Sequence, residues 1–249
     1  MTTTVRPTAE PQPATPAGVG MTSVRKTALV AGVLYIVTFA SSIPAAFILI
    51  DPVLANADFM TRPGIANPLL VGSFLDLINA LAAIGTAVAL FPLLKRQHEG
   101  FALGFVTTRM FEAAVIVIGV ISLLTAVTVY QGAASADAAS LVTTGTTLAA
   151  TYHWVFILGP ILMSALNALL LGTLMYRSRL VPRAIPVMGL IGAPLMIASF
   201  VALFFGVHET SAPTHFLAAA PIFLWELSLG FYMAVKGFKP SPITSTSGA

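Results

Sequence analysis

The sequence predicts an all-α membrane protein, a bundle of six transmembrane helices with both termini in the cytoplasm. Composition is the first reason: 8% of the 249 residues are charged and 57% are hydrophobic, whereas soluble domains carry about 25% charged residues. The second is length, because apolar runs of about 20 residues, enough to cross a bilayer as a helix, recur along the chain. The third is the placement of lysine and arginine, which alternates from loop to loop.

The elements follow in order along the chain. Residues 1–24 are rich in proline, threonine and alanine, so we expect a disordered N-terminal tail. Residues 25–238 form the transmembrane domain, and 239–249 form a second disordered tail. The six spans are expected at 27–50, 69–94, 101–129, 147–176, 184–207 and 216–235. They should be helices, because a backbone in lipid must satisfy its own polar groups within the segment.

The small, polar segment between the third and fourth spans is expected to be a flexible external loop. Four prolines lie inside the expected spans and remove backbone donors: Pro44, Pro160, Pro194 and Pro221. We expect each of them to kink or locally open its helix.

Basic residues flank the spans on one side of the predicted bundle. They are Arg25, Lys26, Lys95, Arg96, Arg177, Arg179, Arg183, Lys236 and Lys239. The opposite loops hold Arg62. Since lysine and arginine in short loops mark the cytoplasmic side, both termini are predicted inside. The first span also resembles a secretory signal, but its apolar part continues past Ala46, which favours a retained helix.

Few ionisable or amide side chains fall inside the spans. They are Asp76, Asn79, Arg109, Glu112, His153, Asn167 and Glu226. A charged residue at the centre of a membrane helix costs about 2.5 to 3.5 kcal/mol, so we expect these groups to face the bundle interior and contact one another. Residues three apart share a helix face, which presents Arg109 and Glu112 together toward a neighbour.

The acids in this set outnumber the arginine. Burial favours the neutral form of a carboxyl group, so we expect at least one acid, Glu226, to be protonated near neutral pH. Such a group could carry a proton, and the leading hypothesis is that the cluster binds or moves a small solute or a proton across the bilayer. The alternative is a structural, sensory or assembly protein, in which hydrogen bonds between polar groups only fix helix packing.

Other classes of function find little support in the sequence. A cysteine count of 0 removes disulfides and thiolate chemistry. An external metal site of His153, His208, His215 and Glu209 lacks any metal-binding spacing, and we predict no metal and no cofactor. The sequence contains no P-loop, nucleophile elbow or dinucleotide fingerprint, so we predict no enzymatic activity. The scattered basic residues argue against nucleic-acid binding. The oligomeric state is left open.

Several segments resemble one known family of bacterial integral-membrane proteins. They are RKTALVAGVLYIVTFASSIPA, GTAVALFPLLKRQHEGFALGFVTTRMFEAA, YRSRLVPRAIPVMGLIGAPLMIAS and WELSLGFYMAVKGF. Together they are similar to domain of unknown function 4386 over about residues 25–238. Its polar positions correspond here to Arg109, Glu112, Arg183, Pro186 and Glu226. The resemblance implies a compact multi-span helical protein of the bacterial plasma membrane and implies no activity.

Overall fold

The computed structural model describes residues 23–132 and 137–244, and these fold into helices joined by short turns. The elements are α1 (Ser23–Ile43), η1 (Pro44–Ile50), α2 (Asp51–Leu54), η2 (Phe59–Thr61), α3 (Ala66–Leu94), α4 (Glu99–Gly132), α5 (Ala138–Phe156), η3 (Ile157–Ile161), α6 (Leu162–Ser178), α7 (Ala184–Phe204) and α8 (Pro213–Val235). The part of the chain so described contains no strand. The predicted all-α class is confirmed.

Six helical segments are long and apolar enough to cross a membrane, which confirms the predicted number of spans. They are Ser23–Leu54, Ala66–Leu94, Glu99–Gly132, Ala138–Ser178, Ala184–Phe204 and Pro213–Val235. On the outer surface of α3, Phe74, Leu81 and Val88 are 61% to 63% exposed. In a membrane protein this surface faces lipid, where exposed apolar residues are favourable.

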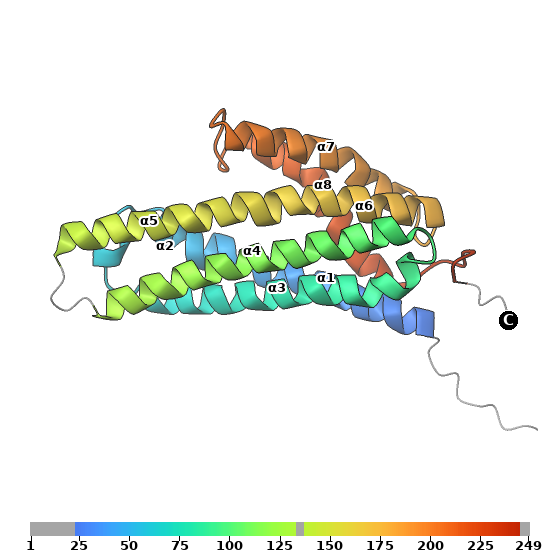
Figure 1. Cartoon of the computed structure of the whole chain (residues 1–249), viewed down its shortest axis with the longest axis horizontal. Helices are drawn as coiled ribbons and strands as arrows, with labels where there is room; N and C mark the ends of the chain where they lie inside the picture. The colour runs from blue at the N-terminus through green and yellow to red at the C-terminus, as the bar shows by residue number, and fades with distance from the viewer. Residues whose placement is uncertain (1–22, 133–136, 245–249) are drawn as a thin grey trace, which may run out of the picture.

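The six spans close into a ring. α4 packs against α3, α3 against α1, α1 against α8, α8 against α7, α7 against α6, and α6 against α4. In Figure 1, α7 and α8 lean away from α5 at one end of the bundle and approach α6 toward the other. A ring of this kind encloses an interior that all six spans can reach.

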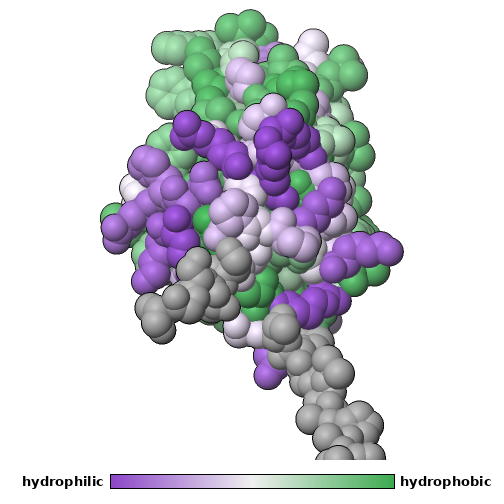
Figure 2. Space-filling view, turned by 90° about the vertical axis from the view of Figure 1, so that its right-hand side faces the viewer, coloured by the Kyte–Doolittle hydropathy of each residue, from purple (hydrophilic) through white to green (hydrophobic). Residues whose placement is uncertain are grey.

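Both ends of the described chain lie at the same end of the bundle, where α1 begins and α8 finishes (Figure 1). We call it the terminal end, and the opposite one the far end. Hydrophilic side chains gather on the terminal end, and apolar surface covers the sides beyond it (Figure 2). Basic residues lie in the first turn of α1, between α3 and α4, from the last turn of α6 to the start of α7, and just after α8, and all of them belong to this end.

The far end is built from helices longer than a membrane span requires. A bilayer needs about 20 helical residues, whereas α4 has 34 residues and the rod formed by α5, η3 and α6 has 41. Beneath this projecting pair, Phe59 and Met60 of η2 are 1% exposed and pack with Leu123, Ala126 and Val127 of α4.

The prediction of a flexible loop before the fourth span is wrong from residue 138 onward, because the helix α5 begins at Ala138. Asp137 caps the helix by accepting hydrogen bonds from the backbone N–H groups of Ala139 and Ser140. The hydroxyls of Thr147 and Thr151 donate to carbonyls four residues earlier, so these polar side chains bond within the helix. Residues 133–136 lie outside the described chain.

Two of the four span prolines coincide with a change of helix type. Pro44 begins the π-helical segment η1, and Pro160 lies inside the π-helical segment η3. Pro194 and Pro221 lie within the α-helices α7 and α8. Proline lacks the N–H that an α-helix requires, and a wider turn accommodates its ring. The expected local opening is therefore found at Pro44 and Pro160.

The segment after α8 contacts the helices at the terminal end. The backbone N–H of Lys239 donates to the carbonyl of Leu180 at 2.8 Å, and the hydroxyl of Ser241 donates to the carbonyl of Ser178 at 2.6 Å. Arg96 donates to the carbonyl of Ile243. Residues 239–244 of the expected C-terminal tail are thus hydrogen-bonded to the bundle. The rest of that tail, 245–249, and residues 1–22 of the expected N-terminal tail lie outside the described residues.

Candidate functional site

Arg109 of α4 lies at the centre of the ring with 3% of its surface exposed. Its Nη1 donates to Oε2 of Glu112, and its Nη2 donates to Oε1 of Glu226, each at 3.0 Å. Nη2 also donates to the hydroxyl of Tyr35 at 3.0 Å. These bonds join α4 to α8 and α1. The arginine and the two glutamates singled out in the sequence therefore meet within the bundle.

Amide and hydroxyl groups extend this network to α6. Nδ2 of Asn167 donates to Oε2 of Glu112 at 2.9 Å, the same oxygen that accepts from Arg109. The hydroxyl of Thr108 donates to Oδ1 of Asn167 at 2.5 Å. Glu112 is thus held by two donors, whereas Glu226 accepts from Arg109. Of the two glutamates, Glu226 has the more exposed side chain, 16% against 9%.

Aromatic rings surround the guanidinium of Arg109. Its carbon Cζ lies 5.1 Å from the ring centre of Tyr35 and 5.8 Å from that of Phe105. Cation–π attraction at such distances partly replaces the water that the charge has lost. Nε of Arg109 is buried without a hydrogen-bond partner among the described residues. The arginine is held by two acids, a hydroxyl and two rings.

A second polar pair lies toward the far end. Oδ2 of Asp76 in α3 accepts a hydrogen bond from the hydroxyl of Tyr152 in α5 at 2.9 Å. Asp76 is 7% exposed. Within residues 23–132 and 137–244 no lysine, arginine or histidine forms an ion pair with it. Its charge is therefore not compensated by the described protein.

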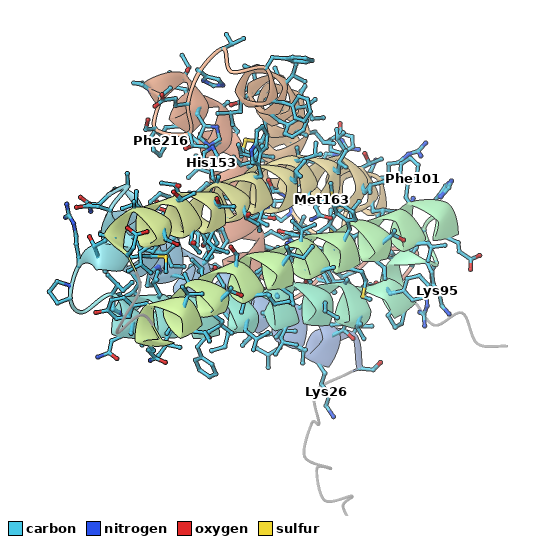
Figure 3. All side chains as sticks on the ribbon, turned by 60° about the vertical axis from the view of Figure 1, so that its left-hand side comes forward. Lys26, Lys95, Phe101, His153, Met163 and Phe216 are labelled. Atoms are coloured by element: carbon cyan, nitrogen blue, oxygen red, sulfur yellow. The ribbon has the colours of Figure 1, made fainter. Side chains whose placement is uncertain are left out.

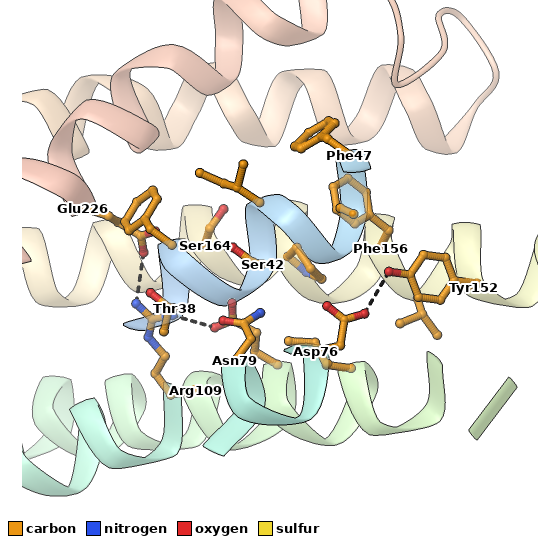
Figure 4. Close-up of a pocket in the computed structure, with 17 residues that line it drawn as sticks. Thr38, Ser42, Phe47, Asp76, Asn79, Arg109, Tyr152, Phe156, Ser164 and Glu226 are labelled. Atoms are coloured by element: carbon orange, nitrogen blue, oxygen red, sulfur yellow. Dashed lines mark hydrogen bonds and ion pairs between the residues drawn. The ribbon is translucent and has the colours of Figure 1, made fainter. Parts of the chain in front are cut away.

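The network around Arg109 and the pair of Asp76 and Tyr152 both border one cavity of about 190 Å³. Its lining includes Thr38, Ser42, Phe47, Asp76, Asn79, Arg109, Glu112, Tyr152, Phe156, Pro160, Ser164 and Glu226. Figure 4 shows Arg109 and Glu226 at one side of this cavity and Asp76 with Tyr152 at the other, with Phe47 and Phe156 near the aspartate. The cavity also meets both π-helical segments, through Phe47 of η1 and Pro160 of η3. Such segments are often found at functional sites.

A wider hollow of about 760 Å³ lies next to this cavity at the far end. We call it the vestibule. It is lined by η1, α2, α5, the turn between α7 and α8, and the start of α8. The lining includes Asp51, His153, Glu209 and Phe216. Figure 3 shows His153 and Phe216 on facing sides of the gap between α5 and α8. Phe47, Tyr152 and Phe156 line the vestibule and the cavity alike.

The structure divides the polar residues predicted from sequence into two groups. Six of them belong to the central network or line the cavity: Asp76, Asn79, Arg109, Glu112, Asn167 and Glu226. His153 does not join them, since it is exposed and lines the vestibule. Its position one residue after Tyr152 turns it toward a different side of α5. The other external histidines, His208 and His215, both hydrogen-bond to Ser199.

Sequence reasoning missed the hydroxyl groups of the site. Tyr35 and Tyr152 provide hydroxyls to Arg109 and Asp76, and Thr38, Ser42 and Ser164 line the cavity. Serine and threonine are common in membrane helices, where their hydroxyls bond to the preceding turn, so their presence alone gives no signal. The usable signal was the tyrosines, because a buried tyrosine hydroxyl usually finds a partner.

Toward the terminal end the interior is filled. Phe105, Leu90 and Leu94 are each 0% exposed and belong to a large apolar cluster with residues of α1, α6 and α8. The polar cavity therefore adjoins the vestibule on one side and a packed apolar core on the other. With all three carboxylates ionised, the groups around the cavity would carry one positive and three negative charges.

The family model described as Domain of unknown function (DUF4386) matches residues 30–237, which include every residue that lines the cavity. No curated protein and no solved structure matches the chain.

Proposed function

The chain belongs to the DUF4386 family, and we propose that it binds a small solute or a proton in the cavity between Arg109 and Asp76 and moves it across the bilayer. The observation that carries the proposal is a membrane-embedded cavity whose polar wall has more acidic than basic groups. Ionisable residues inside a membrane are costly and commonly mark the path of a solute or ion. We infer a transport role and no enzymatic one, since the sequence carries no catalytic motif.

Glu226 is the residue proposed to carry a proton. It lines the cavity, its side chain is the more exposed of the two glutamates, and it accepts from Arg109 through Oε1. Glu112, in contrast, is held by both Arg109 and Asn167. Protonation of Glu226 would remove its charge and weaken the ion pair with Arg109, which joins α8 to α4. Proton binding is thereby coupled to the packing of α8.

The arrangement supports access from one side at a time. The vestibule adjoins the cavity at the far end, and an apolar core lies beyond Arg109 at the terminal end. Moving a bound solute onward requires the terminal half of the ring to open, as in transporters that alternate access to a central site. We propose that the terminal end is cytoplasmic and that the membrane is the bacterial plasma membrane. The basic residues at the terminal end support that orientation.

Flux through reconstituted liposomes tests the proposal. Proton entry is followed with an internal pH dye, and a broad panel of labelled solutes is tested for uptake. Glu226→Gln and Asp76→Asn should each lower the flux about tenfold or more, as loss of a charge-assisted contact predicts. Asp58→Asn is the control, since Asp58 is an exposed carboxylate paired with Arg62 in a far-end turn. Absence of any flux from well-folded parent protein, across protons and the whole panel, would rule transport out.

A second candidate function is structural, and the connectivity of Arg109 favours it. Through Tyr35, Glu112 and Glu226 the arginine links α1, α4 and α8, and Asn167 adds α6. Interhelical hydrogen bonds of this kind contribute about 0.6 kcal/mol each on average in membranes. If Glu226→Gln lowers the melting temperature while liposomes show no flux, the network serves packing alone.

A further inference from the structure

We propose that the Asp76 side of the cavity binds a small organic ammonium ion, with the Asp76 carboxylate as counter-ion and the rings of Phe47 and Phe156 as its apolar walls. This inference rests on the proposed function and specifies the chemical class of its solute. It separates the cavity into two parts: Arg109 with its glutamates, which is internally paired, and Asp76, which is open to a ligand.

The first step of the argument is charge. Arg109 is shared between Glu112 and Glu226 and forms no bond with Asp76. The described chain supplies Asp76 with a neutral hydroxyl, that of Tyr152, and with no cation. A buried carboxylate without a compensating charge is strongly unfavourable unless it is protonated or meets a cation from outside. The site is therefore built to attract positive charge.

The second step is size and oxygen content. A cavity of about 190 Å³ has room for more than a single water molecule, which needs about 10 to 15 Å³. A hard metal cation prefers a close shell of oxygen ligands, which for calcium means six to eight oxygens at roughly 2.3 to 2.6 Å. Here Asp76, Asn79 and Tyr152 share the space with Phe39, Phe47 and Phe156 and with aliphatic side chains. The mixed lining suits an ammonium group that carries carbon substituents.

The third step is the aromatic wall. Phe47 comes from η1 and Phe156 from the end of α5, and both line the cavity beside Asp76 (Figure 4). Aromatic faces attract ammonium ions, and rings combined with a carboxylate are a recurrent way to hold alkylated ammonium. The side chain of Asn79 lines the same cavity and forms no hydrogen bond within the described residues, which leaves its amide oxygen to accept from a ligand N–H.

The fourth step is the route of entry. The vestibule is lined by the carboxylates of Asp51 and Glu209 and leads to Phe47, Tyr152 and Phe156, which it shares with the cavity. Acidic walls raise the local concentration of cations. Tyr152, which lines both hollows, also donates to Asp76. A cation that passes from the vestibule into the cavity would therefore meet Asp76.

Equilibrium binding to purified protein in detergent tests the inference directly. The probes are methylammonium and tetramethylammonium, and tert-butanol serves as a neutral molecule of similar shape to the latter. Both ammonium ions should bind, and tert-butanol should bind about tenfold more weakly or not at all. Asp76→Asn should weaken ammonium binding about tenfold or more, by loss of the charged partner. Phe156→Leu should weaken tetramethylammonium about threefold or more, by loss of the ring face.

Controls make each outcome decisive. Asp58→Asn removes an exposed far-end carboxylate and should leave the affinities unchanged. If Asp76→Asn fails to fold, Phe156→Leu and the comparison with tert-butanol still decide the result. Equal binding of tert-butanol, unaltered affinity in Asp76→Asn, or preference for sodium or potassium over both ammonium ions would overturn the inference.

Failure of this inference is distinguishable from failure of the proposed function. Flux of protons or other solutes without ammonium binding would leave transport standing and refute the ammonium site. Ammonium binding that depends on Asp76, in a protein without flux, would establish the site and refute transport. Absence of both would refute both proposals.

Discussion

At the scale of single residues, Arg109 is the group on which the interior depends. It is the one membrane-embedded cation in the described part of the network, and it compensates two glutamates at 3.0 Å. Removing one partner of a buried ion pair is more damaging than removing the pair, because the remaining charge is left without compensation. The arginine can therefore be tested by deleting it alone and together with the acids.

Arg109→Ala should lower the free energy of unfolding by about 3 kcal/mol or more, since it leaves Glu112 and Glu226 buried without their cation. The triple variant that adds Glu112→Gln and Glu226→Gln should recover part of that loss. Denaturant titration in detergent micelles measures both. A triple variant no more stable than Arg109→Ala would show that the acids are not compensated by the arginine.

Residue chemistry also explains which parts of the site the sequence could predict. Arg109, Glu112 and Glu226 stand out because charge inside an apolar span demands a partner, and the partners had to be one another. Tyr35 and Tyr152, which bond to Arg109 and Asp76 respectively, give a weaker signal, because a tyrosine is tolerated at many positions in a membrane helix and needs a partner for its hydroxyl where it is buried. The surrounding cavity depends on the shapes of several helices, which no single residue specifies.

At the scale of elements, close approach of α1 and α8 positions Tyr35 and Glu226 against Arg109. A Cβ added at Gly32 would lie 2.7 Å from the carbonyl oxygen of Gly230, which belongs to the backbone of the facing helix. Backbone cannot move aside as a flexible side chain can. Small residues at such a crossing allow membrane helices to pack closely.

Gly32→Ala should therefore destabilise the protein by about 1 to 3 kcal/mol, the usual effect of overpacking, and should separate α1 from α8. Gly100→Ala is the matched control, because an added Cβ there would meet the side chain of His98, at 3.3 Å. Thermal unfolding in detergent should show a lower midpoint for the first variant and an unchanged or slightly higher one for the second. Equal midpoints would contradict the close packing of α1 on α8.

The sequence indicates a disturbed helix at Pro44 and at Pro160, but it does not predict the π-helical segments η1 and η3. Proline signals a disturbed helix, but whether the chain kinks or widens depends on neighbouring helices. At Pro160 the helix widens beside the cavity, whereas at Pro194 it remains α-helical.

The number of spans could be predicted from the length of the apolar runs. The early start of α5 could not be predicted from apolar length, because this segment is polar. Its threonines donate hydrogen bonds to carbonyls of the same helix, and the segment is therefore helical although it lacks an apolar run.

The difference in helix type between Pro160 and Pro194 gives a second prediction at the scale of elements. Pro160→Ala restores a backbone donor and should let η3 relax toward an α-helix, changing the direction of Phe156 and Ser164 at the cavity wall. We expect an unchanged or higher melting temperature together with weaker solute flux. Pro194→Ala, in a regular helix away from the cavity lining, is the control and should keep parent flux. Parent flux in Pro160→Ala would show that the wide turn is not needed.

At the scale of the whole molecule, six spans bring both described ends of the chain to the same end of the bundle (Figure 1). That end carries the basic flanks, and its interior is filled by apolar side chains. The far end carries the vestibule with Asp51 and Glu209. The two ends of the bundle thus differ in charge and in the hollow that they carry, and the orientation of the bundle in the membrane decides from which side the proposed solute would enter.

The orientation can be measured because the chain has a cysteine count of 0, so a single introduced cysteine reports one position. Glu99→Cys places a thiol at the exposed start of α4, on the terminal end, and Ser211→Cys places one in the exposed turn before α8, on the far end. Basic loops are retained in the cytoplasm. In intact bacterial cells, a membrane-impermeant maleimide should therefore label Cys at position 211 and spare that at 99, and permeabilisation should expose both. The reverse pattern would place the vestibule in the cytoplasm, so that the cavity would take up its solute from inside the cell.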